Sequence, residues 1–485
     1  MFPENEQSNS VGRPSPVNMM RCFDKFWRRE LSMFNSSLTR ICVTMLGSSR
    51  RRVLFIVLLA LLLRVGYILY SPADLWAYDE RIYDLIARNM QNGYGFCYAP
   101  GYRLAWRPPL YPIYLFFVYS LLDHSYLIVR LLQSVFGTAT VLITYKLGSR
   151  IFNERVGLLA AIITALYPSL ILYTRFLLTE TLFILLFVAA ALSLHKISDL
   201  PLFGSSIAGL FLGLAALCKP ATLLIVPILS IWLLSMMPRI KDALINFTFL
   251  CLAILSIIIP WTIRNYVVFH EVVLISTNGG LNLFTGNNPG ATGHWERAEE
   301  NLAFYAPQSE LEGVSEVQSD KIMRKAALTF IRQNPTRFLV LAMQKFRFFW
   351  TDNEELVTTP LEAASTFAGW ILLLLASVMG IALSMGEWRK SLLLYLLIIG
   401  YMSVHLVFFA LARFRLPLVP LLSIYAGYGI VSAPSIWSQM KSRKLGRAEA
   451  LSLATAGAVV IYYVYWIATH WINLIEKTQR WLGFS

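Results

Sequence analysis

A set of charged side chains stands beside long apolar runs, and their types suit the handling of a phosphate. They are the acids Asp79 and Glu180 and the bases Arg107, Lys219, Arg264, Arg413 and Arg415. A charge at the centre of a membrane helix costs roughly 2.5–3.5 kcal/mol, so we expect each of them near the end of a span. Any single one could reach the interface along its own stem. Acids and bases gathered at one membrane face would instead favour a phosphate-handling site.

The acidic pair Asp79–Glu80 follows directly after the first long apolar run. Asp79 begins a pattern with helical spacing, which places it on the apolar face of a helix rather than the polar one. The pattern continues through Ile82, Tyr83, Ile86 and Met90. One interpretation is that the pair only stabilises the positive end of a helix dipole in the first turn. Glu80 could also share an acid role with Asp79, or pair with Arg81 or Arg88.

The composition of the chain indicates a membrane protein. Only 14% of the 485 residues are charged, 56% are hydrophobic and the mean hydropathy is +0.57, whereas soluble domains carry roughly 25% charged residues. The net charge of +14 comes from short clusters between apolar runs. Topology and anionic lipid headgroups explain such clusters better than nucleic acid does. The cysteines lack the spacing of metal ligands, so we expect no metal site and no required cofactor, while dependence on a divalent metal stays open.

Positive charge sets the predicted topology. The cluster Arg50–Arg52 precedes the first run, which places residues 1–52 in the cytoplasm and Asp79 outside. The stretch 107–122 is short for a span and is typical of a helix lying at the outer surface. The other runs then give about 11 spans, with every compact basic cluster inside and the charged set outside. These spans are 53–70, 125–149, 156–175, 180–197, 205–218, 221–237, 243–260, 363–385, 391–411, 416–433 and 449–469.

This topology divides the chain into an all-α series of parts. They are a basic cytoplasmic arm (1–52), a transmembrane module (53–260) with a first external loop (71–124), a large external loop (261–362), and C-terminal spans with a short external tail (363–485).

The large external loop holds two further features. Residues 278–293 predict either a turn-rich lid over a substrate or a plain structural loop, and 323–350 predicts a helix at the outer interface. The substrate-loop candidates are Tyr83, Asn278, Gly279 and Asn287. Of the histidines, His405 is expected to be an interior residue, and His124 to be a loop residue without a partner.

Two stretches resemble the first external loop of the GT-C membrane glycosyltransferases. They are "YDERIYDLIARNMQNGYGF" (78–96) and "WRPPLYP" (106–112), and they are most similar to the aminoarabinose transferase and protein mannosyltransferase group. Motifs of this group continue in order with "LLTETLF" (177–183), "GLAALCKP" (213–220), "PWTIRN" (260–265) and "ARFRLPLVP" (412–420). The chain departs from the aminoarabinose transferases at Arg107, where they have lysine. Arginine keeps the charge and offers a planar, bidentate phosphate contact.

The resemblance implies a polytopic GT-C fold and a sugar donor linked to polyprenyl phosphate. The acceptor would be a hydroxyl or a phosphate group on a lipid, a glycan or a protein. The enzyme would work among membrane lipids at the periplasmic face of a bacterial inner membrane. Asp79 matches the general base of the family, with Glu80 as a candidate partner, and Glu180 matches a second acid. The five bases of the charged set would hold the donor phosphate.

The resemblance also implies a mechanism. A partly desolvated Asp79 would have a raised pKa and accept the proton of the acceptor hydroxyl. Displacement in a single step would invert the anomeric centre and needs no covalent enzyme intermediate. The alternatives are a transporter or flippase for lipid-linked glycans, and a ligase or polymerase of the O-antigen type. Release of polyprenyl phosphate from the donor would distinguish a transferase from a transporter.

Overall fold

The computed structural model describes residues 48–71, 74–293, 314–351 and 356–442, together with single positions between 446 and 465. The chain divides into two units, Met1–Phe55 and Ile56–Ser485, and all the contacts that follow lie within the second. Most of the predicted cytoplasmic arm, and most of the predicted last span and external tail, fall outside the described residues.

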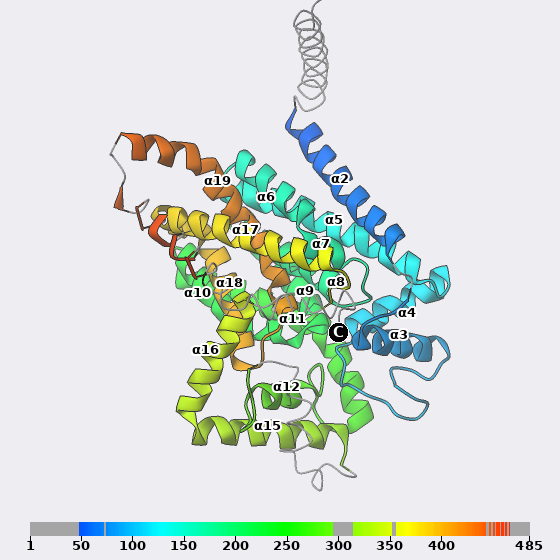
Figure 1. Cartoon of the computed structure of the whole chain (residues 1–485). Helices are drawn as coiled ribbons and strands as arrows, with labels where there is room; N and C mark the ends of the chain where they lie inside the picture. Colours follow the sequence, from blue (N-terminus) through cyan, green and yellow to red (C-terminus); the bar gives the residue numbers. More distant parts are fainter. Residues whose placement is uncertain are drawn as a thin grey trace, which may run out of the picture. The chain divides into compact units, whose positions relative to one another are not determined.

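Every named element of the described residues is helical (Figure 1). The α-helices are α2 (Ser49–Tyr70), α3 (Tyr78–Gln91), α4 (Leu110–Leu122), α5 (Tyr126–Ile151), α6 (Glu154–Leu166), α7 (Pro168–Leu172), α8 (Glu180–His195), α9 (Pro201–Cys218), α10 (Val226–Met236), α11 (Ile240–Phe269), α12 (Gly279–Gly286), α15 (Glu316–Gln333), α16 (Pro335–Thr351), α17 (Pro360–Ser384), α18 (Trp388–Val407) and α19 (Val419–Lys441). Short 3-10 helices are η1 (Lys196–Ser198), η2 (Pro220–Ile225), η3 (Met385–Glu387) and η4 (Ala412–Leu418). The all-α fold predicted from the sequence is confirmed for the described residues.

The apolar helices are long enough for a multi-pass membrane protein. In the described part of the chain, 6 helical stretches have the length and composition to cross a membrane. They are Ser49–Tyr70, Tyr126–Ile151, Pro201–Cys218, Ile240–Phe269, Pro360–Val407 and Ala412–Gln439. Leu110–Leu122, Glu180–His195 and Pro220–Met236 are apolar but shorter. The number of about 11 spans therefore stays a prediction.

Close helix contacts depend on small residues, as is common between membrane helices. Helix α9 packs along α11, and α17 packs along α19. A Cβ atom at Gly209 of α9 would lie 2.4 Å from the backbone oxygen of Leu250, and one at Gly380 of α17 would lie 1.8 Å from that of Tyr425. Any larger residue at these glycines would force the paired helices apart.

The segments predicted as external loops differ in part from the predictions. The first loop contains the short helix α4, which packs against α3, in agreement with a helix too short to span. The single helix expected over 323–350 is wrong, because α15 ends at Gln333 and α16 begins at Pro335. Proline disfavours the helical conformation in the residue before it, which explains the break at Asn334. The turn-rich stretch 278–293 contains the helix α12, which packs against α15.

Candidate functional site

Asp79 lies between two arginines that come from distant parts of the chain. It stands in the first turn of α3, and its Oδ1 accepts a hydrogen bond from Arg107 Nη2 at 2.5 Å. Its Oδ2 accepts one from Arg413 Nη2, in η4, at 3.2 Å. The three side chains are between 14% and 20% exposed, so the cluster is shielded but open to one side. This triad is the centre of the candidate site.

The triad corrects the expected acidity of Asp79. Burial alone raises the pKa of its carboxyl group, but the charges of Arg107 and Arg413 outweigh burial and hold the pKa below its ordinary value. The prediction of a raised pKa is therefore wrong. The sequence revealed the desolvation but not that two arginines would contact the same carboxylate.

A second ion pair, Glu180–Lys219, lies beside the triad. Glu180 begins α8 and Lys219 follows the end of α9, and their side chains meet at 3.1 Å. Glu180 is almost fully buried. The Lys219 ammonium lies 5.4 Å from the ring centre of Phe414, the neighbour of Arg413. The charge of Arg413 acts on Glu180 as well as on Asp79, so the triad and the Glu180–Lys219 pair form one electrostatic site.

Aromatic rings support Arg107. Its guanidinium lies 4.4 Å from the ring centre of Trp106 and 5.5 Å from that of Tyr83. Tyr83, a predicted substrate-loop residue, is buried and meets Tyr111 edge-on at 5.2 Å. Cation–π contacts of this kind hold a guanidinium in place while leaving its donors available.

Glu80 follows Asp79 in α3 but has a different set of partners. Its carboxylate is fully buried and accepts hydrogen bonds from the backbone N–H groups of Trp76 (2.9 Å), Ala77 (2.7 Å) and Leu177 (2.8 Å). Glu80 does not pair with Arg81 or Arg88, the alternative that the sequence left open. Arg81 donates to the Leu75 carbonyl at 3.4 Å, and Arg88 pairs with Asp84 at 2.9 Å. These contacts favour an anchoring role, because they tie the start of α3 to the segment that leads to α8.

Two of the five predicted phosphate-binding bases are occupied with backbone carbonyls. Arg264 donates to the carbonyls of Leu104 at 2.8 Å and Phe96 at 3.2 Å, and so holds the loop between α3 and α4. Arg415 is buried, donates to the carbonyl of Phe349 at 3.4 Å and lies 4.3 Å from the ring centre of Trp370. The structure thus brings Arg107, Lys219 and Arg413 to the site and gives the other two to loop and helix packing.

The other substrate-loop candidates belong to the packing around α12. Asn278 precedes α12 and accepts a hydrogen bond from Ser276 at 2.8 Å. Gly279 opens the helix near Arg324. Asn287 is fully buried and accepts a hydrogen bond from Lys345 Nζ at 3.1 Å. These packing contacts explain the positions of Asn278, Gly279 and Asn287 without a role in substrate binding.

Sequence reasoning missed the residues that hold the segment before Glu180. Arg130 Nε donates to the Arg175 carbonyl at 2.7 Å, and Gln133 Nε2 donates to the carbonyls of Thr174 and Phe176 at 3.0 and 2.9 Å. A signal was present, since Arg130 and Gln133 are polar residues three apart inside a predicted span, where such residues usually face a partner.

Further polar contacts lie beyond the triad. His124, expected to have no partner, contacts Asp84 at 2.8 Å, and Tyr119 also donates to Asp84 at 3.0 Å. These contacts fasten α3 to α4 and to the segment after it. Within the described ranges, no three His, Cys, Asp or Glu side chains gather closely enough to hold a metal ion.

Lys345 gives a prediction for stability. Its ammonium is fully buried and donates to Asn287 Oδ1 and to the Val407 carbonyl at 3.3 Å. Both acceptors are uncharged, and burial lowers the pKa of Lys345 to about 7. Between this value and the usual pKa near 10.4, the unfolded chain binds one more proton than the folded one. The free energy of unfolding should therefore rise with pH above about 7, by roughly 1 kcal/mol per pH unit.

The check is the apparent melting temperature in detergent between pH 7 and 9. Lys345→Met should flatten this dependence, whereas Lys325→Met, at an exposed position of α15, should leave it unchanged. Equal slopes for wild type and Lys345→Met would show that Lys345 is not the titrating group.

Comparisons with known proteins agree with this architecture. Residues 106–263, about a third of the chain, match the family model described as dolichyl-phosphate-mannose-protein mannosyltransferase. No curated protein sequence gives a significant match. The crystal structure of ArnT from Cupriavidus metallidurans bound to undecaprenyl phosphate is 13% identical, with a TM-score of 0.50, over 89% of this chain and 74% of that chain.

A second solved structure is the archaeal oligosaccharyltransferase AglB from Archaeoglobus fulgidus, in complex with an inhibitory peptide and a dolichol-phosphate. It is 15% identical, with a TM-score of 0.49, over 86% of this chain and 54% of that chain. The chain thus spans about half the length of that oligosaccharyltransferase. The likeness to ArnT concerns the fold, and it confirms the fold class predicted from the motifs. The chain is therefore a multi-pass membrane protein with the GT-C fold that its sequence resembles.

Proposed function

We propose that this chain is a glycosyltransferase that moves a sugar from a polyprenyl-phosphate donor to an acceptor at the external membrane face. The observation that carries the proposal is the triad, in which Arg107 and Arg413 share the carboxylate of Asp79. A pair of arginines around one anion is a geometry that also suits a phosphate. The undecaprenyl phosphate bound to ArnT supports this class of donor.

Because Arg107 and Arg413 both hold the Asp79 carboxylate, we infer that these ion pairs are exchanged before Asp79 acts as a base. A carboxylate held by two arginines is ionised but is a weak base. The donor phosphate would compete for Arg107 and Arg413 and draw their charge away from Asp79. The pKa of Asp79 would then rise toward the value that burial favours, and the base would become effective only when the donor is bound.

The reaction then follows as a single displacement. The acceptor hydroxyl oxygen attacks the anomeric carbon while its proton passes to the Asp79 carboxylate. The bond between the anomeric carbon and the phosphate oxygen breaks, and its electron pair leaves with the polyprenyl phosphate. Arg107 and Arg413 stabilise the charge that develops on that phosphate. Glu180, fixed by Lys219, would orient the acceptor or the base.

Transfer in detergent solution tests the proposal and separates it from transport. The purified protein is mixed with radiolabelled undecaprenyl-phosphate hexoses or pentoses and an extract of envelope lipids and glycans. Because detergent removes the compartments, a transporter or flippase gives no product there. We expect release of undecaprenyl phosphate together with a labelled acceptor. Intact donors throughout, with movement of the donor across reconstituted vesicles, would overturn the proposal in favour of a transporter.

The same assay distinguishes a ligase or polymerase. Such an enzyme would transfer a preassembled glycan and leave these single-sugar donors untouched. The measured donor preference would also identify the sugar class.

A further inference from the structure

The segment between α7 and α8, residues 173–179, is irregular yet buried along its whole length. A buried irregular backbone needs partners for its polar groups, because an unpaired one costs about as much as a lost hydrogen bond. Some N–H groups of the segment bond to nearby backbone carbonyls, such as that of Arg175 to Leu172 at 3.2 Å. Other partners are side chains: Arg130 and Gln133 of α5 donate to its carbonyls, and Glu80 of α3 accepts from the N–H of Leu177. The segment therefore links the turn of α3 that carries Asp79 to Glu180, which is the first residue after the segment.

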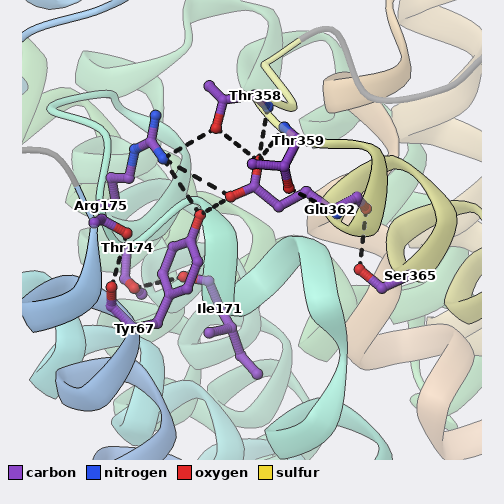
Figure 2. Close-up of polar contacts among 9 residues, drawn as sticks. Tyr67, Ile171, Thr174, Arg175, Thr358, Thr359, Glu362 and Ser365 are labelled. Atoms are coloured by element: carbon purple, nitrogen blue, oxygen red, sulfur yellow. Dashed lines mark hydrogen bonds and ion pairs between the residues drawn. The ribbon is translucent and has the colours of Figure 1, made fainter. Parts of the chain in front are cut away.

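The side chain of Arg175 leads from this segment to the end of the large external loop. Figure 2 shows its guanidinium pointing toward the Glu362 carboxylate, with the hydroxyls of Tyr67 and Thr358 beside them. Arg175 Nη1 lies 3.8 Å from Glu362 Oε1, 3.5 Å from the Tyr67 hydroxyl and 3.4 Å from Thr358 Oγ1. The Tyr67 hydroxyl donates to Glu362 Oε1 at 2.7 Å and so bridges the pair.

Glu362 is itself fixed at the start of α17. Its Oε2 accepts hydrogen bonds from the N–H and the hydroxyl of Thr358, at 2.7 and 2.9 Å, and from the N–H of Thr359 at 3.2 Å. The carboxylate thus caps α17 with one oxygen and holds Arg175 and Tyr67 with the other. Glu362 therefore connects the first turn of α17 to the buried segment 173–179.

We propose that Arg175, Glu362 and Tyr67 form a clamp that positions Glu180 relative to Asp79. The inference rests on the proposed function for its catalytic consequence, but not for its structural one. The clamp fixes one side of segment 173–179, and Glu80, Arg130 and Gln133 fix the other. Arg175 is five residues from Glu180, and the backbone between them belongs to no helix, so movement at the clamp is passed along a short irregular stretch to that carboxylate.

The clamp residues are positioning residues and do not contact the triad. Arg175 is only 5% exposed and Glu362 17% exposed, so their interaction is shielded from water and salt. Loss of one partner would leave the other buried charge poorly compensated. We expect segment 173–179 to become more mobile and the Glu180 carboxylate to shift. Arg107 and Arg413 should keep their positions and still bind the donor phosphate.

The decisive variant is Tyr67→Phe, which removes one hydroxyl and keeps the ring. We expect kcat for sugar transfer to fall about 5-fold, since one hydrogen bond of roughly 1 kcal/mol is lost, with the donor KM unchanged. Glu362→Gln should lower kcat on the order of 10-fold, because a charge-assisted contact is lost. The matched controls are Tyr70→Phe, exposed on the same helix, and Glu387→Gln, in an exposed pair with Lys390. Neither control should change kcat.

Hydrogen–deuterium exchange supplies a readout that does not need transfer. In Tyr67→Phe and Glu362→Gln, peptides covering 173–179 should exchange faster than in wild type, and peptides covering α12 should not. Faster exchange with an inactive wild type would support the clamp and refute the proposed function. Unchanged exchange in 173–179, or a loss of kcat equal to that of the controls, would overturn the clamp even if wild type is active.

Discussion

Asp79→Asn should abolish sugar transfer while strengthening the binding of undecaprenyl phosphate. Asparagine keeps the size of the side chain but cannot accept the proton, and loss of a general base costs typically 10²–10⁴-fold in rate. The same change removes the carboxylate that pairs with Arg107 and Arg413. Both arginines then become available to a phosphate, so affinity should rise on the order of 10-fold.

Misfolding would lower both sugar transfer and the binding of undecaprenyl phosphate. The prediction is instead that transfer falls while binding becomes stronger. The measurements are kcat for transfer and the equilibrium binding of undecaprenyl phosphate to the purified variant. Asp123→Asn is the matched control, because Asp123 lies in the same loop with a φ of 62° that asparagine tolerates. Near-normal turnover in Asp79→Asn would reduce Asp79 to a helix-start residue and make Glu180 the candidate base.

The second large effect is expected at Arg107. If Arg107 grips the donor phosphate, Arg107→Ala should lower kcat/KM on the order of 10- to 100-fold, since a charge-assisted contact is worth roughly 1.5–3 kcal/mol. Arg107→Lys should recover part of this loss, because the charge remains but the planar fork does not. Kinetics across a series of donor concentrations, on monodisperse protein, would measure both.

A structural role for Arg107 predicts a different pattern. Arg107 also lies against Trp106 and Tyr83, so Ala could lower the melting temperature while folded enzyme keeps its activity. Arg103→Ala, at an exposed position of the same loop, is the control for a general effect of charge. Unchanged kinetics in Arg107→Ala would leave Arg413 and Lys219 to hold the phosphate.

The sequence predicted the helical architecture and named the three residues that meet at the centre of the candidate site, and the reason is physical. Charged residues beside apolar runs must gather where they can be solvated or paired, so Asp79, Arg107 and Arg413 could be expected on one face. These three residues also lie in motifs that resemble the GT-C family and that follow one another in the order of that family. The structure then joined Asp79 to a residue 334 positions away along the chain.

The roles of Glu80, Arg264 and Arg415 could not be read from the same pattern. A charged side chain near a span end can serve a ligand or the chain's own backbone, and both uses look alike in sequence. Glu80 and Arg264 satisfy backbone groups of irregular segments, whose existence depends on packing that local pattern does not reveal. The acidity of Asp79 was missed for a related reason, since two arginines on one carboxylate are visible only in three dimensions.

The central claim is that Arg107 and Arg413 exchange Asp79 for the donor phosphate. A structure of the full-length protein with bound undecaprenyl phosphate, determined by cryo-electron microscopy, tests it most directly. The account predicts the phosphate within hydrogen-bonding distance of both guanidinium groups, with the Asp79 carboxylate released from at least one of them. A phosphate bound elsewhere, with Asp79 still contacting both Arg107 and Arg413, would contradict it.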